Sequence, residues 1–263
     1  MEELTKTANC QPAIFVHSMA CVTALTREVP TQWTMLGFRG TAGLSLGEWT
    51  ALHMAEALSF EDTLKVLAAR GRFMQEACEE REGGMTSIIG LPVEKLREIC
   101  AATGAEIANL NSAEQTVLSG PKDAVAAAAK MATEAGAKKA IPLKVAGAYH
   151  SSLMASAAKK LEELLAGIHF KQPRFPVLSN ATGLPHGGPD DIKRAMVKQV
   201  TSSVQWLSCI EWFKSNGIKE YLECGPGNVL SGLIKRIEKE ASTANVQDLA
   251  TLQQAAAWLN AGH

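Results

Sequence analysis

The chain carries the sequence Ala42-Gly43-Leu44-Ser45-Leu46-Gly47-Glu48-Trp49, in which a serine has a glycine two residues away on each side. Apolar and small residues precede it over 34–42, and a helical pattern follows over 49–58. A strand, a sharp turn and a helix in this order predict a nucleophile elbow that exposes the serine hydroxyl. We expect glycine at both positions because side chains there would collide with the neighbouring strand and helix. The alternative is an ordinary glycine-rich loop capped by a serine.

Composition limits the classes of partner. Lys and Arg total 26 against 27 Asp and Glu, so a net charge of -1 gives no general attraction for nucleic acid or an acidic membrane. The six cysteines form no Cys-x-x-Cys pair and have no histidine at metal spacing, which predicts reduced thiols in a cytoplasmic protein and no metal site. The polar opening residues exclude a secretory signal, and no apolar run reaches transmembrane length.

The middle of the chain has its own periodicity. Helices are predicted at 92–103 and 121–135, between strands at 86–89, 106–110, 116–119 and 138–143. This β-α-β-β-α-β order is typical of a ferredoxin-like unit. We therefore predict an α/β protein in which a ferredoxin-like subdomain at 84–147 is inserted into a core formed by 1–83 and 148–263.

The elements predicted on either side of the subdomain form the core. Helices are predicted at 11–26 with Pro12 in the first turn, 60–81 capped by Ser59, 152–165, 190–200, 204–216 and 229–239, and strands at 176–180 and 220–223. The alanine-rich tail from Ser242 onward has no assigned role. Gly225-Pro226-Gly227 lacks the third glycine of a dinucleotide fingerprint, and the Asn180-Ala181-Thr182 sequon is interpreted as accidental.

A nucleophilic serine needs a base, and the chain has six histidines. His150 follows the last strand of the predicted subdomain, so it lies at the junction between that subdomain and the core. Ligand-binding sites are often found at such junctions. His186 lies in a glycine- and proline-rich stretch and is interpreted as a polar loop residue. His150 is therefore the candidate base, and we expect it to have a nearly ordinary pKa.

Several motifs together resemble a known family. They are the elbow at 43–48, Arg70-Gly71-Arg72-Phe73-Met74-Gln75, Asn109-Leu110-Asn111-Ser112, Gly147-Ala148-Tyr149-His150, Val204-Gln205-Trp206 and Glu223-Cys224-Gly225-Pro226-Gly227. Their order and spacing resemble those of the malonyl-CoA:acyl carrier protein transacylases over about 11–236. The resemblance implies an α/β-hydrolase-like core with the ferredoxin-like insertion. It also implies transfer of malonyl from malonyl-CoA to the phosphopantetheine thiol of acyl carrier protein, in fatty acid or polyketide biosynthesis, without a cofactor.

The resemblance implies a role for each site residue. Ser45 matches the acylated nucleophile and His150 its general base, while Arg70 matches the arginine that pairs with the free malonyl carboxylate. Gln11 matches a residue that lines the acyl pocket, and the segment of Gln199 matches the one whose backbone carbonyl orients the histidine. From the elbow itself, the Leu46 amide is predicted to face the oxyanion. By the resemblance, Tyr149 occupies the bulky aromatic position of malonyl-selective members.

The sequence departs from the family pattern twice. Leu44 replaces the histidine usual in the elbow. The opening strand and its glycine- and glutamine-rich loop, which supplies the second oxyanion amide, have no counterpart, through truncation or loss. We therefore expect slow acylation and an unpaired sheet edge beside the elbow.

Two rival functions follow from the same residues. A serine hydrolase or thioesterase would use the elbow but would have no use for a buried cation at Arg70. A non-catalytic carrier-protein docking module would keep the fold without turnover. Basic residues on two predicted helices are the candidates for contact with an acidic carrier: Lys193, Arg194, Lys198, Lys235, Arg236 and Lys239.

Overall fold

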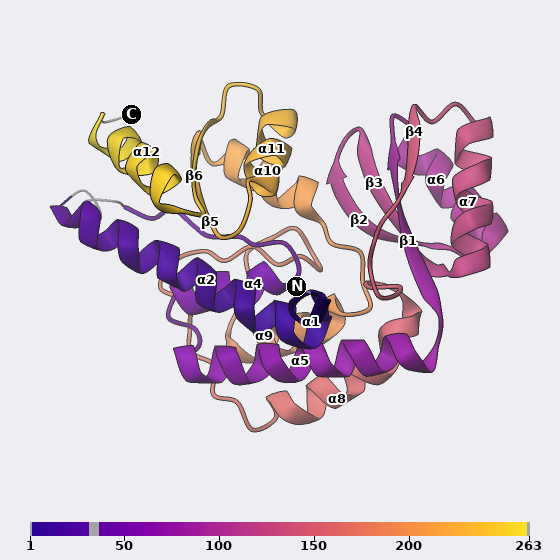
Figure 1. The fold of residues 1–263 in the computed structure, drawn as a ribbon, viewed down its shortest axis with the longest axis horizontal. Coiled ribbons are helices and arrows are strands. Elements are labelled where there is room, and N and C mark those ends of the chain that lie inside the picture. The colour runs from indigo at the N-terminus through magenta and orange to yellow at the C-terminus, as the bar shows by residue number, and fades with distance from the viewer. Residues whose placement is uncertain (1, 32–36, 262–263) are drawn as a thin grey trace.

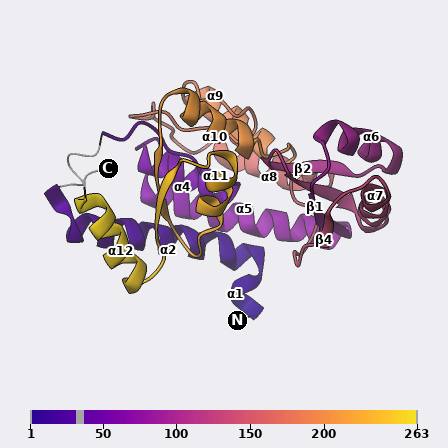
Figure 2. The ribbon, with the colours of Figure 1, turned by 90° about the horizontal axis from the view of Figure 1, so that it is seen from above.

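A computed structural model describes residues 2–31 and 37–261. A small sheet with two helices lies at one end of the molecule, and the remaining elements lie at the other (Figures 1 and 2). This arrangement confirms the predicted mixed α/β class with an inserted unit.

The small lobe has the predicted ferredoxin-like pattern. Its elements are β1 (Gly83–Ile89), α6 (Val93–Thr103), β2 (Glu106–Ser112), β3 (Gln115–Pro121), α7 (Lys122–Glu134) and β4 (Lys139–Pro142). The strands form an antiparallel sheet in the order β2-β3-β1-β4. Ile88 and Leu118 face α6 and α7, while Met85 and Val117 pack on the other side with Tyr149, as the period of two requires. The bounds 84–147 of the subdomain remain a prediction.

Two long helices organise the core. Helix α2 (Thr7–Glu28) follows the short α1 (Glu2–Thr5) and packs along α5 (Phe60–Glu80). The predicted position of Pro12 in a first turn is wrong, because α2 begins at Thr7 and Pro12 lies inside it. Pro12 has no N–H, so one helical hydrogen bond is missing there. The predicted cap of α5 is confirmed: the Ser59 side chain accepts a hydrogen bond from the Asp62 N–H.

Shorter helices complete the core around these two. They are α4 (Leu46–Met54), α8 (Ala155–Leu165) after a 3-10 turn at Ser152–Met154, α9 (Pro189–Gln199), α10 (Trp206–Ser215) and α11 (Val229–Ile237). The elbow helix α4 begins directly after Ser45 and not at the predicted residue 49, so Ser45 is its N-cap. The main apolar cluster includes Phe15, Trp49 and Leu67.

The core sheet is present as two fragments. Strands β5 (Glu220–Cys224) and β6 (Ser242–Val246) pair in parallel. The predicted strand at 34–42 is wrong for its described part, which makes only a parallel bridge between Thr41 and Val177. Residues 34–36 lie outside the described residues. The predicted strand at 176–180 is likewise reduced to isolated bridges at Val177 and Leu178. Glycine has a low strand propensity, and Gly37 and Gly40 fall within the predicted strand. Of its described part, only Thr41 makes backbone hydrogen bonds to the neighbouring segment, at Pro176 and Leu178, so no continuous ladder forms.

The tail from Ser242 is part of the core. It forms β6 and then α12 (Leu249–Asn260), whose Asp248 cap accepts a hydrogen bond from the Thr251 N–H. Ala255 and Ala256 pack with Cys21 and Leu25 of α2. The small alanine side chains allow α12 to lie close to α2, which explains the composition of this segment.

Candidate active site

Ser45 sits in a strained turn at the start of α4. Its backbone has φ 54° and ψ -104°, a conformation that residues other than glycine rarely adopt. Asn180 Oδ1 accepts a hydrogen bond of 2.6 Å from the Ser45 N–H, and Gln199 Nε2 donates one of 2.9 Å to the Ser45 carbonyl. These bonds hold the strained turn from both sides.

The two glycines of the elbow differ in role. A Cβ at Gly43 would lie 2.1 Å from the Gly47 carbonyl, so the predicted need for glycine is met at this position. A Cβ at Gly47 would meet no atom within 4 Å among the described residues. The predicted collision at Gly47 is therefore wrong, because this position lines a cavity and does not face a packed helix.

His150 lies against the Ser45 hydroxyl. Its Nε2 is 2.8 Å from Ser45 Oγ, and its Nδ1 is 2.9 Å from the Gln199 carbonyl oxygen. A carbonyl oxygen can only accept, so Nδ1 carries the hydrogen and Nε2 accepts from the serine hydroxyl. The sequence positions 45, 150 and 199 thus meet in one hydrogen-bonded chain.

The acceptor for His150 is the end of a helix. Gln199 is the last residue of α9, and the last four carbonyls of a helix have no partner within it. The C-terminal end of a helix also carries partial negative charge, which favours a cation beside it. No carboxylate among the described residues bonds to His150, so this carbonyl takes the place of an acidic partner.

Arg70 is buried beside the serine. The side chain is 1% exposed, Nη2 donates to Ser45 Oγ at 3.0 Å, and Nη1 donates to Gln11 Oε1 at 2.5 Å. Nη2 also donates to Gln199 Oε1 at 3.0 Å. No carboxylate lies within salt-bridge distance of the guanidinium in the described part of the chain, and Nε has no partner there. The amides of Gln11 and Gln199 align the cation, and the buried Glu48 carboxylate, bonded to the same Gln199 amide, stabilises it without direct contact.

Burial changes the titration of both groups. Desolvation, followed by repulsion from the Arg70 cation, lowers the pKa of His150 from 6.5 to about 4. The expectation of a nearly ordinary histidine pKa is therefore wrong, although the imidazole is neutral and able to accept a proton at pH 7. Desolvation also lowers the pKa of Arg70 to about 10, so the guanidinium stays charged at neutral pH.

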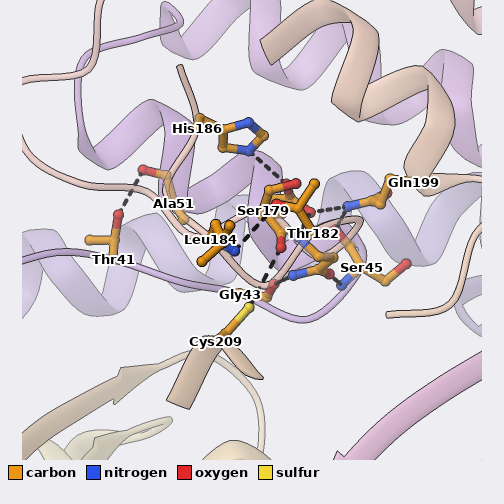
Figure 3. Close-up of polar contacts among 12 residues, drawn as sticks. Thr41, Gly43, Ser45, Ala51, Ser179, Thr182, Leu184, His186, Gln199 and Cys209 are labelled. Atoms are coloured by element: carbon orange, nitrogen blue, oxygen red, sulfur yellow. Dashed lines mark hydrogen bonds and ion pairs between the residues drawn. The ribbon is translucent and has the colours of Figure 1, made fainter. Parts of the chain in front are cut away.

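Three polar residues of the site were missed in the sequence. The fully buried Glu48 carboxylate accepts hydrogen bonds from His186 Nε2 at 2.7 Å, Gln199 Nε2 at 2.6 Å and the Asn180 N–H at 3.1 Å. Figure 3 shows the His186 and Gln199 side chains with the dashed lines of their bonds. His186 lies in a loop as predicted, but its side chain is only 1% exposed and belongs to this buried network. Asn180 is also buried and bonds to the Gly43 carbonyl, which puts the sequon out of reach of solvent.

Leu46 and Tyr149 complete the predicted set. The Leu46 N–H has no hydrogen-bond partner among residues 2–31 and 37–261. The Tyr149 ring packs on the core, and its hydroxyl contacts Thr7 and Cys78; burial is the main cause that raises its pKa to about 12. Within the same residues, no group of side chains could hold a metal ion, and no helix is long and apolar enough to cross a membrane.

Comparison with known proteins gives consistent matches. Residues 1–251 match the acyl transferase domain family. The malonyl CoA-acyl carrier protein transacylase of Bacillus subtilis (strain 168) is 39% identical over 259 residues, which cover 97% of this chain and 80% of that protein. The solved malonyl CoA-acyl carrier protein transacylase from Coxiella burnetii is 36% identical with a TM-score of 0.90, covering 98% of this chain and 82% of that one. A type II PKS acyl-carrier protein in complex with its malonyl-transacylase, PlMCAT:AntF, gives 37% identity and a TM-score of 0.90, covering 97% of this chain and 82% of that one.

Proposed function

This chain belongs to the acyl transferase family, and we propose that it transfers malonyl from malonyl-CoA to the phosphopantetheine thiol of acyl carrier protein. The names of its relatives support both substrates, and the solved complex with a carrier protein supports the second. The reaction serves fatty acid or polyketide biosynthesis.

The first half-reaction acylates Ser45. The Ser45 oxygen attacks the thioester carbonyl carbon while its proton passes to His150 Nε2. The Leu46 N–H, which has no partner among the described residues, donates to the oxyanion that forms on the carbonyl oxygen. When the carbon–sulfur bond breaks, the coenzyme A sulfur takes the proton from His150, which leaves a malonyl ester on Ser45. The α9 C-terminus stabilises the transient imidazolium through the Gln199 carbonyl.

The second half-reaction reverses these roles. His150 accepts the proton of the phosphopantetheine thiol, and the sulfur attacks the ester carbonyl. The Ser45 oxygen leaves and recovers the proton, so the enzyme returns to its starting state. This is a ping-pong transfer through one covalent intermediate.

The observation that carries the proposal is the buried Arg70 cation next to the serine, which makes no direct ion pair within the described residues. Burying a cation without a direct ion pair is costly, so such a site suits a ligand of opposite charge. A malonyl thioester places its free carboxylate two carbons from the reacting carbonyl, where the guanidinium can bind it. Gln11 orients the guanidinium and lines the acyl site, and Tyr149 limits the size of the acyl group.

Intact mass spectrometry after incubation with malonyl-CoA tests the proposal. We expect one malonyl adduct on the wild type, none on Ser45→Ala, and loss of the adduct when phosphopantetheinylated carrier protein is added. An adduct on the alanine variant would contradict the assignment of Ser45. Rapid loss of the adduct to water without carrier protein would indicate a hydrolase, and no adduct under any condition would favour a docking module.

A further inference from the structure

Glu106, the first residue of β2, is bonded to the core across the boundary between the lobes. Its Oε1 and Oε2 accept hydrogen bonds from the Ser152 N–H at 3.0 and 3.1 Å, and Oε1 also accepts from the Ser152 hydroxyl at 2.6 Å. One carboxylate thus holds both donors of a single residue. Ser152 lies two positions after His150, at the end of the segment 147–152, which we call the histidine loop.

The histidine loop holds His150 in a strained backbone conformation. Its φ is 58°, in the left-handed region that residues other than glycine rarely occupy. Such a conformation persists only where the surroundings fix it from several sides. Before His150 the loop is held by close packing, because a Cβ at Gly147 would lie 2.4 Å from the Cys78 sulfur of α5. After His150 the Glu106 carboxylate ties the loop to the small lobe.

The same strand holds the hydrogen-bond acceptor of His150. β2 is an edge strand of the small sheet, and it contacts α10 of the core (Figure 1). The Val204 N–H donates to the Ala108 carbonyl at 2.8 Å, and the Leu110 N–H donates to the Val204 carbonyl at 2.9 Å. Val204 closes the short segment that begins at Gln199, whose carbonyl bonds to the imidazole. β2 therefore holds both the histidine loop and the carbonyl that orients the histidine.

A pocket leaves the small-lobe side of His150 without close packing. Its volume is about 460 Å³, and it is lined by His150, by Arg97 and Cys100 of α6, by Glu106 and Ile107 of β2, and by the core residues 201–203. Packing of side chains therefore cannot fix the histidine loop from this direction, so the hydrogen bonds to Glu106 take that role. The pocket also gives water a route to the imidazole if the loop moves.

We infer that Glu106 is a positioning residue for the proposed reaction. Its three side-chain hydrogen bonds within the described residues all go to Ser152, so it acts on the imidazole through the loop. By fixing Ser152 it keeps His150 Nε2 at 2.8 Å from the Ser45 hydroxyl oxygen and Nδ1 at 2.9 Å from the Gln199 carbonyl oxygen. Reaction rates depend steeply on such geometry, since a displacement of about 1 Å can cost roughly a hundredfold. The expected effect on rate rests on the proposed function, whereas the expected effect on the ring does not.

The alternative is a purely structural role for Glu106. The Ser152 N–H belongs to the first residue of the 3-10 turn that leads into α8, and a carboxylate stabilises the N-terminal end of a helix. As a cap alone, Glu106 would contribute to the free energy of unfolding and leave the imidazole unaffected. The two roles therefore differ at the His150 ring, which can be observed without any substrate.

Nitrogen-15 NMR of the histidine rings at neutral pH is the first readout, with His150→Asn to assign the signals. In the wild type, His150 should be a single Nδ1–H tautomer, because Nδ1 donates to the Gln199 carbonyl. Glu106→Ala should give a mixture of the two tautomers, because the released loop weakens this bond. Glu114→Ala is the matched control: this glutamate is exposed in the turn after β2, near Lys138, and its removal should leave the ring signals unchanged.

The rate of acylation is the second readout. At saturating malonyl-CoA, Glu106→Ala should slow the appearance of the Ser45 ester about tenfold. The half-saturating concentration of malonyl-CoA should change less than about twofold, because the residues that bind the substrate are untouched. Glu106→Gln retains one oxygen acceptor for Ser152 and should lose about threefold in rate. Glu114→Ala should be acylated at the wild-type rate.

Three results would overturn the inference: unchanged ring signals in Glu106→Ala, an equal change in Glu114→Ala, or a loss that appears only as a higher half-saturating concentration. If Glu106→Ala does not fold, Glu106→Gln decides by the same two readouts. Altered ring signals and slower acylation in that variant would support the inference, and wild-type behaviour in both would overturn it. Altered ring signals in a protein whose wild type takes up no malonyl would support the positioning role and contradict the proposed function alone.

Discussion

The buried Glu48 carboxylate accepts a hydrogen bond from His186 Nε2, although the two residues lie 138 positions apart in the sequence. The other carboxylate oxygen accepts from the Asn180 N–H and from Gln199 Nε2. Asn180 holds the Ser45 N–H, and the Gln199 carbonyl holds His150. Glu48 therefore fixes the residues that hold Ser45 and His150, the two side chains of the proposed reaction.

Removal of this carboxylate should weaken the fold and the site together. Glu48→Ala leaves three buried donors without an acceptor, and we expect a loss of about 3 to 5 kcal/mol in the free energy of unfolding. Glu48→Gln retains one acceptor and should cost less, roughly 1 to 3 kcal/mol. Urea unfolding measures both. The exposed Glu56, paired with Arg174, supplies the control: Glu56→Gln should change stability little. Equal effects at positions 48 and 56 would contradict the positioning role.

Arg70 should determine the preference for malonyl over acetyl groups. Arg70→Ala removes a charge-assisted contact that only the malonyl carboxylate makes, so malonyl transfer should lose about 2 to 4 kcal/mol of transition-state stabilisation and acetyl transfer little. The ratio of kcat/KM for the two coenzyme A thioesters is the measurement. Arg72→Ala, on the same helix but exposed, is the control. A parallel loss for both substrates would make Arg70 structural.

The low pKa of His150 predicts an unusual pH profile. The base form is required, so acylation should stay constant from neutral pH to well below 6.5 and fall only as the pH approaches about 4. Between these values the unfolded chain binds the proton and the folded chain does not, so stability should decrease as the pH falls from 6.5 toward 4. NMR titration, with His150→Asn to assign the signal, measures the pKa directly. A midpoint near 6.5 would show that the imidazole is not desolvated.

The site residues that belong to local sequence motifs could be predicted from the sequence. The spacing of Ser45, Arg70 and His150 matched a family pattern, and the small lobe was readable from its alternating periods. Glu48 was not predictable, because an acid in the first turn of a helix is ordinary and its partners lie far away in the chain. The strand at 34–42 was predicted from apolar character alone, whereas a strand also needs a continuous ladder to a neighbour, and only Thr41 of the described part makes a bridge.

The last prediction concerns the approach of the carrier protein. Lys235 and Arg236 are exposed on α11, and Arg236 lies 3.4 Å from Gln115 at the turn between β2 and β3, so this part of α11 reaches both lobes. Acidic carrier proteins should be attracted to such cations. Lys235→Glu with Arg236→Glu should slow malonyl transfer to the carrier roughly tenfold at low salt, with a smaller effect as salt rises. Acylation of Ser45 by malonyl-CoA, followed separately by stopped-flow, should be affected less. Lys122→Glu with Lys130→Glu, both exposed on α7 in the small lobe, changes the net charge by the same amount and is the control (Figure 1). If the control and the double variant slow transfer to the carrier equally, the effect is caused by overall charge, and the carrier protein binds to another surface.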